Sequence, residues 1–290
     1  MKRKVYITFA QEELKSMKTL KLVIIGLFVS LQLSAQTYDE LIGKAMDAVE
    51  KDSLYQAEVW FKQALKLEPA NMRNALLFSN LGTVQRRMGK NKEALESYTL
   101  ALNLTPYSTT MLLNRASLYL DLDYLDKAYV DYCNVIDLDD KNKEALQFRA
   151  YIYMRRRQYQ DAKVDYQKLL ESAPEDKTAR IGIAMVNQKL QRYRESLEEL
   201  NRLVVDYPKD VELLKARAEL EVEMNSLEMA LLDLENAARL APNDAEIYVM
   251  CGEIYLAQNR KREAYVAFEK AIELGIPRPQ LQEQLKASKK

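Results

Sequence analysis

The sequence predicts an all-α protein built as a linear stack of repeated helix pairs. One phrase returns along the chain, in which a small residue is followed by a large one, another small one and often a proline: ALESYTLALNLTP (94–106), AYVDYCNVIDLDD (128–140), AKVDYQKLLESAP (162–174) and ALLDLENAARLAP (230–242). Successive copies are separated by 34 residues or by twice that number. Glycine and proline number only seven each among 290 residues, which favours long helices with few turns over a sheet.

Each copy of the phrase is expected to be the second helix of a repeat. Seven repeats account for residues 38–278, with first residues at 38, 75, 109, 143, 177, 211 and 245. In the repeat from 75, FSNLGTVQRRMGK reads as a first helix and a turn, and KEALESYTLALNL as a second helix that stops before Pro106. Small residues such as Gly82 and Ala94 let paired helices approach to about 8–10 Å. A fixed period of this kind is the signature of repeat architectures.

This pattern resembles the tetratricopeptide repeat family. The resemblance rests on the 34-residue period and on residues that recur in each repeat: Leu81, Gly82, Ala94, Tyr98, Ala101 and Pro106 in one, and Cys251, Gly252, Tyr255, Ala264, Phe268 and Ala271 in another. The repeat from 177 departs most, because Leu200 and Leu203 replace the usual aromatic and small residues. The resemblance implies a right-handed superhelical α-solenoid whose concave groove is lined by first helices. It also implies a non-enzymatic protein that binds extended peptides or helices.

The N-terminal segment is expected to direct export. Residues 17–35 read as a signal peptide, with Lys18 and Lys21 before an apolar run at 22–33 and the small residue Ala35 at a plausible cleavage site. This run of 12 residues spans about 18 Å in a helix, short of a ~30 Å hydrocarbon core, so an uncleaved anchor is the less favoured alternative. We therefore expect a periplasmic or cell-envelope location and no membrane span in the mature chain.

Two further segments are expected to lie outside the repeats. Residues 1–16 carry Glu12 and Glu13, which do not suit a positively charged leader. They are interpreted as an N-terminal extension that is disordered or that precedes a true start at Met17. Residues 279–290 are expected to form a capping helix and a basic tail, because stacked repeats need a polar cap to remain soluble.

Composition argues against an enzyme, a metal protein and a nucleic-acid binder. Histidine is absent, which removes the commonest general base and the commonest metal ligand. Basic and acidic residues balance at 43 each, so there is no global basic field of the kind that attracts nucleic acid. Cys133 and Cys251 are too few for a zinc site and too distant for a disulfide, so both are expected to be buried free thiols. No catalytic, cofactor-binding or metal-binding residue is assigned.

The candidate site follows from the resemblance, under which the second, fifth, ninth, twelfth and thirteenth residues of a repeat line the groove. The last two repeats place five acidic residues and one basic residue there: Glu212, Glu219, Glu223, Glu246, Glu253 and Lys215. Basic residues hold such positions further back: Arg86, Arg87, Arg155 and Lys189. Phe148 and Tyr151 are expected on the same side. An acidic concavity would attract a basic peptide segment, although the same charges also fit an ordinary solvated helix face.

These features favour a protein–protein interaction scaffold that holds an extended or helical segment of another protein in its groove. A carbohydrate-binding or cell-wall-binding protein that uses Phe148 and Tyr151 is the second hypothesis. An enzyme is the least favoured, because the sequence has no histidine, no Gly-rich phosphate loop and no large insertion between repeats. Association of the chain with copies of itself through the terminal repeats stays open, as do the partner's identity and the oligomeric state.

Overall fold

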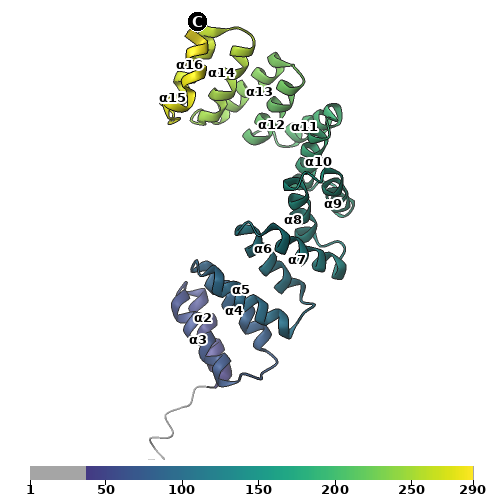
Figure 1. The fold of residues 1–290 in the computed structure, drawn as a ribbon, viewed down its shortest axis with the longest axis vertical. Coiled ribbons are helices and arrows are strands. Elements are labelled where there is room, and N and C mark those ends of the chain that lie inside the picture. The colour runs from purple at the N-terminus through teal and green to yellow at the C-terminus, as the bar shows by residue number, and fades with distance from the viewer. Residues whose placement is uncertain (1–36, 290) are drawn as a thin grey trace, which may run out of the picture. The chain divides into compact units, whose positions relative to one another are not determined.

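The computed structural model describes residues 37–289 as a succession of α-helix pairs (Figure 1). No strand occurs among these residues, and the helices pack pairwise along the chain, which confirms the predicted all-α solenoid. The expected N-terminal extension at 1–16 and the expected signal peptide at 17–35 lie outside the described residues. Between residues 37 and 289, no helix combines the length and the apolar character that a membrane crossing requires.

The helices follow one another with short connections. In chain order they are α2 (Tyr38–Glu50), α3 (Leu54–Leu67), α4 (Asn74–Arg87), α5 (Asn91–Leu104), α6 (Thr109–Asp121), α7 (Leu125–Leu138), α8 (Lys143–Arg155), α9 (Tyr159–Ser172), α10 (Lys177–Lys189), α11 (Tyr193–Asp206), α12 (Val211–Glu223), α13 (Leu227–Leu240), α14 (Ala245–Ala257), α15 (Lys261–Glu273), the 3-10 helix η1 (Arg278–Leu281) and α16 (Gln282–Lys289). Even-numbered helices from α2 to α14 are the first helices of their repeats, and odd-numbered helices are the second.

The chain divides into two compact blocks, an N-terminal block up to Leu118 and a C-terminal block from Tyr119 onward. Each block has an apolar core of its own. In the N-terminal block, Tyr38, Phe61 and Leu81 belong to one buried cluster. The C-terminal block holds several such clusters, one of which surrounds Leu234 where α12, α13 and α14 meet.

The turn inside every helix pair uses one residue in the left-handed conformation. These residues have φ between +56° and +74°: Asp52, Gly89, Asp123, Arg157, Gln191, Asn225 and Asn259. The N–H of the next residue donates to the carbonyl five residues earlier, for example from Gln158 to Tyr153 and from Arg260 to Tyr255, both at 2.8 Å. This is the Schellman ending of a helix. Each turn therefore satisfies its backbone through local hydrogen bonds alone.

Side-chain caps fix where several first helices begin. Asn142 accepts a hydrogen bond from the N–H of Ala145 at 3.1 Å, and Asp176 accepts one from the N–H of Ala179 at 2.9 Å. Asp210 caps α12 in the same way. A cap of this kind contributes about 1 kcal/mol to helix stability. The last residue of one repeat is therefore the N-cap of the first helix of the next repeat.

Small residues at the eighth position of a repeat lie against aromatic rings of the same helix pair. A Cβ atom added to Gly252 would stand 2.4 Å from Cε1 of Phe268, and one added to Gly82 would stand 2.8 Å from the ring of Tyr98. Phe268 and Tyr98 are both fully or almost fully buried. The recurring small and large residues of the sequence are thus the two sides of one helix–helix contact.

The C-terminal segment covers the last repeat. Leu281 in η1 and Leu285 in α16 are buried in a cluster with Ala264, Phe268 and Ala271 of α15. Two leucines four residues apart lie on one helix face, which explains why both reach the same apolar surface.

The two cysteines are free thiols. Cys251 is buried, as the sequence predicts. The prediction that Cys133 is buried is wrong, because this residue is half-buried beside the guanidinium of Arg149, with 3.6 Å between Sγ and Nη1.

Candidate functional site

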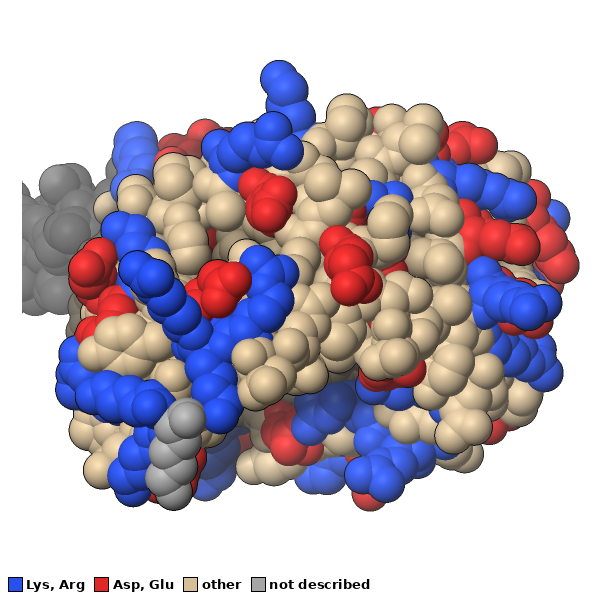
Figure 2. Space-filling view, turned by 90° about the horizontal axis from the view of Figure 1, so that it is seen from above, with Lys and Arg blue, Asp and Glu red and all other residues tan. Residues whose placement is uncertain are grey.

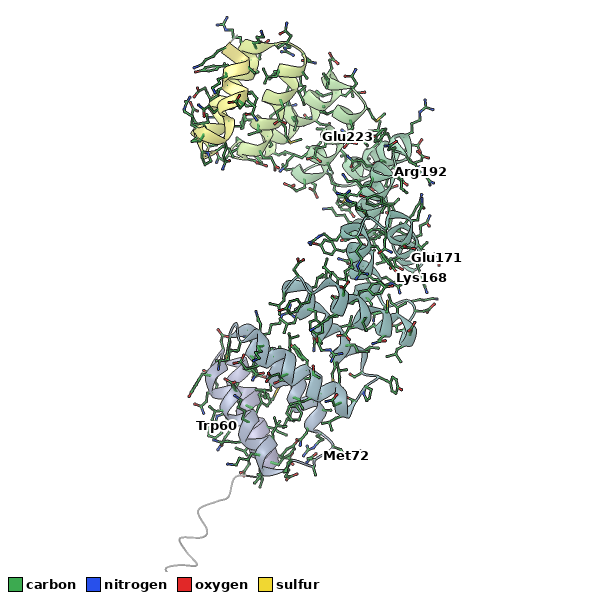
Figure 3. The ribbon with its side chains drawn as sticks, viewed as in Figure 1. Trp60, Met72, Lys168, Glu171, Arg192 and Glu223 are labelled. Carbon is green, nitrogen blue, oxygen red and sulfur yellow. The ribbon has the colours of Figure 1, made fainter. Side chains whose placement is uncertain are left out.

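A groove in the C-terminal block lies between the first helices α12 and α14. Its volume is about 350 Å³, and three carboxylates line it: Glu219 and Glu223 from α12, and Glu253 from α14. Glu223, labelled in Figure 3, is the last residue of α12. The floor is apolar and is formed by Val222, Leu227, Met250, Ile254 and Ala257. The groove therefore combines an apolar floor with a negatively charged rim.

Helical spacing explains why these residues meet. Glu219 and Glu223 are four apart, and Val222 lies between them at three residues from Glu219, so the three share one face of α12. Met250 and Glu253 share a face of α14 for the same reason. Because α12 and α14 are equivalent helices of consecutive repeats, the two faces lie along the same side of the stack. The acidic residues of two repeats are thereby gathered around one apolar strip.

The negative charge of the groove is not fully compensated. The Glu219 side chain is exposed, and its carboxyl group is only partly desolvated by neighbouring protein atoms. This partial burial, followed by the nearby carboxylate of Glu246, raises the pKa of Glu219, while Lys215 and Lys189 oppose the shift. Nε2 of Gln188 donates a hydrogen bond to Glu223 at 2.9 Å. A cation placed in this groove would relieve the repulsion among its carboxylates.

Lys215 is occupied by interactions within the protein. Its Nζ is almost buried and donates to Glu212 at 3.2 Å, to Asp244 at 3.3 Å and also to Glu246. Burial alone would lower the pKa of Lys215, but the hydrogen bonds to these carboxylates raise it above its ordinary value. The sequence groups Glu212 and Glu246 with the other groove acids, whereas the structure pairs both with this lysine.

The basic candidates belong to different blocks, and three of them have partners within their own block. Arg155 in the C-terminal block donates to Asp123 at 3.1 Å and to the hydroxyl of Tyr151 at 2.9 Å. Arg86 and Arg87 belong to the N-terminal block, where Arg86 donates to Ser117 at 3.0 Å and Arg87 pairs with Asp52 at 2.7 Å. Lys189 is exposed at the end of α10 and acts on Glu219 through its charge. On the face shown in Figure 2, basic and acidic side chains are likewise interspersed.

The aromatic candidates do not form an open platform. The ring of Phe148 is half-buried and stacks on the buried ring of Tyr132, with 5.7 Å between centroids and 21° between planes. Tyr151 is exposed, but its ring carries the guanidinium of Arg155 at 5.8 Å and its hydroxyl is hydrogen-bonded to the same residue. A sugar-binding surface would need free ring faces, which these contacts reduce.

Sequence reasoning missed the apolar floor of the groove. Met250, at position six of its repeat, falls outside the positions that the resemblance assigns to the groove, whereas Val222 holds the assigned position twelve but carries no charge; both line the groove. Their presence could have been noticed as apolar residues three away from acidic ones on a first helix. What the sequence cannot supply is that Leu227, the first residue of the second helix α13, also lines the groove.

The chain belongs to the tetratricopeptide repeat family. Sequence profiles described as tetratricopeptide repeats match residues 77–108, 109–142, 153–220 and 245–274. The crystal structure of a tetratricopeptide repeat protein from Parabacteroides merdae is 38% identical in sequence. The match covers 88% of this chain and 100% of that chain, with a TM-score of 0.70.

More distant similarities share the fold over part of the chain. The structure of YrrB, described as a TPR protein with an unusual peptide-binding site, is 22% identical. That match covers 68% of this chain and 100% of YrrB, with a TM-score of 0.52. The mitochondrial import receptor subunit TOM34 of Pongo abelii is 29% identical over 114 residues, which are 38% of this chain. The chain spans 37% of the length of that curated relative.

Proposed function

We propose that the protein is an interaction scaffold that binds a basic segment of another protein in the groove between α12 and α14. The observation that carries the proposal is the meeting of Glu219, Glu223 and Glu253 around an apolar floor. Apolar side chains of the partner would supply affinity on that floor, and lysine or arginine residues would supply specificity and association rate at the rim.

The apolar strip of the groove can receive a short segment in either an extended or a helical conformation. A helix presents side chains at i, i+3, i+4 and i+7 to such a strip, and an extended chain presents alternate residues. The description of YrrB as a peptide-binding TPR protein agrees with this use of the fold. A tetratricopeptide scaffold of this kind performs no catalysis itself.

We further propose that the mature protein acts in the periplasm or at the cell envelope after cleavage behind Ala35. The support is the charged start, apolar run and small residue within 17–35. Determining the N-terminal residue of the protein from fractionated cells tests this. A start at Gln36 in the envelope fraction is expected, and a cytoplasmic protein that starts at Met1 or Met17 would contradict the proposal.

The groove is tested by charge reversal in the full mature chain. Tagged wild-type protein and a Glu219→Lys/Glu253→Lys variant are used to capture partners by cross-linking in intact cells, followed by quantitative mass spectrometry. Glu171→Lys/Glu198→Lys is the matched control, because it makes the same change in net charge at exposed sites on the second helices α9 and α11.

The expected result is a set of envelope proteins that wild type and control capture equally and that the groove variant loses at least tenfold. Reversing two charges that face a basic segment converts attraction into repulsion on both sides of the floor. Equal capture by all three proteins would mean that the binding surface lies elsewhere.

A further inference from the structure

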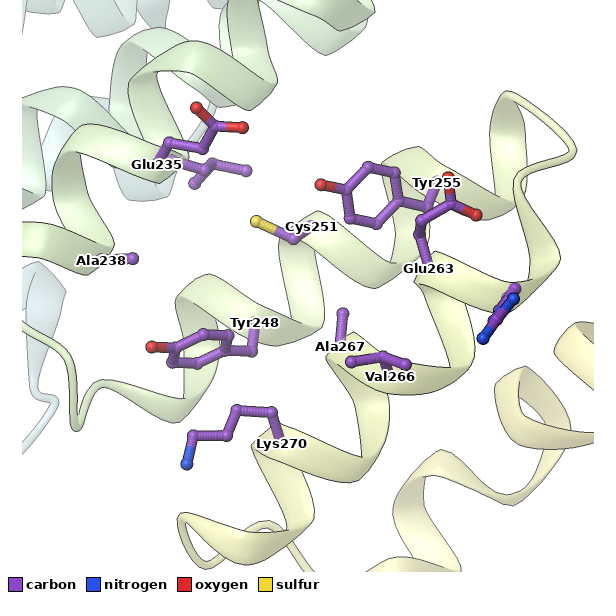
Figure 4. Close-up of a pocket in the computed structure, with 11 residues that line it drawn as sticks. Glu235, Ala238, Tyr248, Cys251, Tyr255, Glu263, Val266, Ala267 and Lys270 are labelled. Carbon is purple, nitrogen blue, oxygen red and sulfur yellow. The ribbon is translucent and has the colours of Figure 1, made fainter.

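A second pocket in the C-terminal block lies between the second helices α13 and α15, and α14 forms its floor (Figure 4). Its volume is about 480 Å³, and its walls include Ala238 and Ala267. Figure 4 shows Cys251 at the centre, with Tyr248 and Tyr255 on either side of it. Most of the lining is therefore apolar or aromatic.

This pocket and the acidic groove use different faces of α14. Tyr248, Cys251 and Tyr255 are spaced by three and four residues and share one face. Met250 and Glu253, which line the groove, lie on another. A ligand in the pocket would leave the groove free, so the two surfaces can be tested separately.

The other repeats show what normally fills this place. Three other repeats have arginine at position seven and aspartate at position 23. Arg149 forms two parallel hydrogen bonds with Asp165, at 2.8 and 2.7 Å, and Arg217 forms two with Asp233, both at 2.6 Å. In the last repeat these positions hold Cys251 and Ala267. The pocket is the space that the missing ion pair leaves.

The surroundings that receive the guanidinium are still present in the last repeat. Nη1 of the arginine also reaches the preceding second helix: Cys133 from Arg149 at 3.6 Å, and Asn201 from Arg217 at 2.9 Å. Glu235 holds this position before the last repeat, and it lines the pocket. The guanidinium of Arg149 also lies over the ring of Tyr153 at 5.8 Å, and Tyr255 is the equivalent ring.

We infer that the pocket receives an arginine side chain presented by another protein. Its guanidinium would donate to the carboxylate of Glu235 beside the ring of Tyr255, and its methylene groups would cover Cys251 and Ala267. Tyr255 already carries one guanidinium, that of Arg260 at 4.4 Å from the ring centroid, but Arg260 does not line the pocket. Other repeats have an aspartate carboxylate at position 23, where the last repeat has Ala267. In this pocket Glu235, on the opposite wall, would take the place of that carboxylate. Arginine fits better than lysine, because a planar guanidinium stacks on an aromatic ring while it donates to a carboxylate.

The basic residues around the pocket do not prevent this. Lys270 lines one edge, away from Glu235 in Figure 4, and its Nζ donates to Glu273 at 3.1 Å. Lys168 holds the same position in the repeat whose pocket contains Arg149, so a lysine there is compatible with a guanidinium. Arg262 also lines the pocket. Its charge favours a guanidinium position close to Glu235.

The thiol of Cys251 contributes no competing charge. Burial, followed by the charge of Glu235, raises the pKa of Cys251 to about 11. The floor of the pocket is therefore a neutral, polarisable surface of the kind that apolar parts of a side chain contact well.

Direct binding of a small probe tests the inference. N-acetyl-L-arginine amide is titrated into the full mature chain at low salt and followed by ligand-observed NMR, which detects millimolar binding. The uncharged isostere N-acetyl-L-citrulline amide is the matched control ligand. Binding of the arginine probe without comparable binding of citrulline is expected, and equal binding of both would overturn the inference.

Three variants in the pocket and one outside it locate the probe. Cys251→Arg/Ala267→Asp introduces the ion pair that other repeats have at these positions, and it is expected to abolish binding of the probe. Ala238→Ile should also abolish binding, because the larger side chain would fill the pocket; isoleucine occurs at the same repeat position as Ile136. Glu235→Gln should weaken binding about two- to fivefold, as the loss of an exposed ion pair does. Glu198→Gln, at an exposed site on α11 that lines neither the pocket nor the groove, should leave binding unchanged. Unaltered binding by both filled-pocket variants, or loss in Glu198→Gln alone, would refute the assignment.

Discussion

Replacement of Glu221 by glutamine is expected to stabilise the protein above neutral pH and not below pH 4.5. The Glu221 side chain on α12 is buried, and among the described residues its Oε2 has no hydrogen-bond partner. Burial, followed by the charge of Asp233, raises its pKa from 4.5 to about 7, although Arg217 opposes the shift. The carboxyl group is thus held protonated more tightly in the folded than in the unfolded state.

The sign and size of the effect follow from that difference. The protonated carboxyl group contributes stability that is complete below pH 4.5 and is lost as the pH rises through 7. One pKa unit corresponds to about 1.4 kcal/mol, so about 3 kcal/mol is lost by pH 8. Glutamine is neutral at every pH and keeps this contribution. Gln85 and Asn187 stand at the same position of other repeats, so a neutral amide fits there.

The assay is urea unfolding followed by circular dichroism between pH 4.5 and 8.5, with Glu221→Gln compared with wild type. The advantage of the variant should grow from near zero to about 3 kcal/mol across this range. Glu223→Gln, two residues away and exposed, should show no such growth. A difference that is constant with pH, or a variant that is less stable at pH 8, would refute the reasoning.

Four further predictions concern packing and ion pairs. Gly252→Ala should lower stability by about 1–3 kcal/mol in thermal unfolding, because its Cβ would stand 2.4 Å from a buried phenylalanine ring. Gly43→Ala, where nothing lies within 4 Å, should raise it by about 1 kcal/mol. Asp165→Ala should lower the free energy of unfolding by about 3 kcal/mol, because it leaves the largely buried guanidinium of Arg149 without its carboxylate. A decrease below about 1 kcal/mol would show that water solvates this charge. Lys215→Met should strengthen the binding of a basic peptide several-fold in a fluorescence titration, since three carboxylates lose their counter-charge; unchanged affinity would show that they do not act on the groove.

The helix pairs could be predicted from the sequence because their determinants are local and repeated. Gly82 and Tyr98 are sixteen residues apart, and both recur with the same period, so a single pattern fixes which helices pack together. Gly89 marks one turn by residue type. Arg157 and Gln191 adopt the same left-handed conformation, although their residue types rarely do so and give no sign of a turn. Their conformation follows from the packing of the two helices that the turn connects.

The candidate site was less predictable, because it depends on contacts between repeats. The pairing of Lys215 with Asp244 and Glu246 joins two repeats through side-chain conformations that no spacing specifies. The pocket at Cys251 had a visible signal, the small residues Cys251 and Ala267 at the two positions where three other repeats have arginine and aspartate. The sequence alone does not show that these positions enclose a space, which becomes evident from the ion pair of Arg217 and Asp233 that fills the equivalent place in the preceding repeat.

The Schellman turns bear on how such a protein changes length. Every turn has the same backbone conformation and makes its hydrogen bonds with carbonyls of the helix before it. If the segment between two turns is deleted, the two ends that are joined therefore have matching backbone geometry. Deleting one whole period, for example from the residue after Arg157 to Gln191, would leave every remaining turn intact. When unequal recombination of the gene adds or removes one repeat, the packing between neighbouring repeats therefore changes at one junction only. The ion pair or pocket that each repeat carries can then be inherited, duplicated or discarded as a unit.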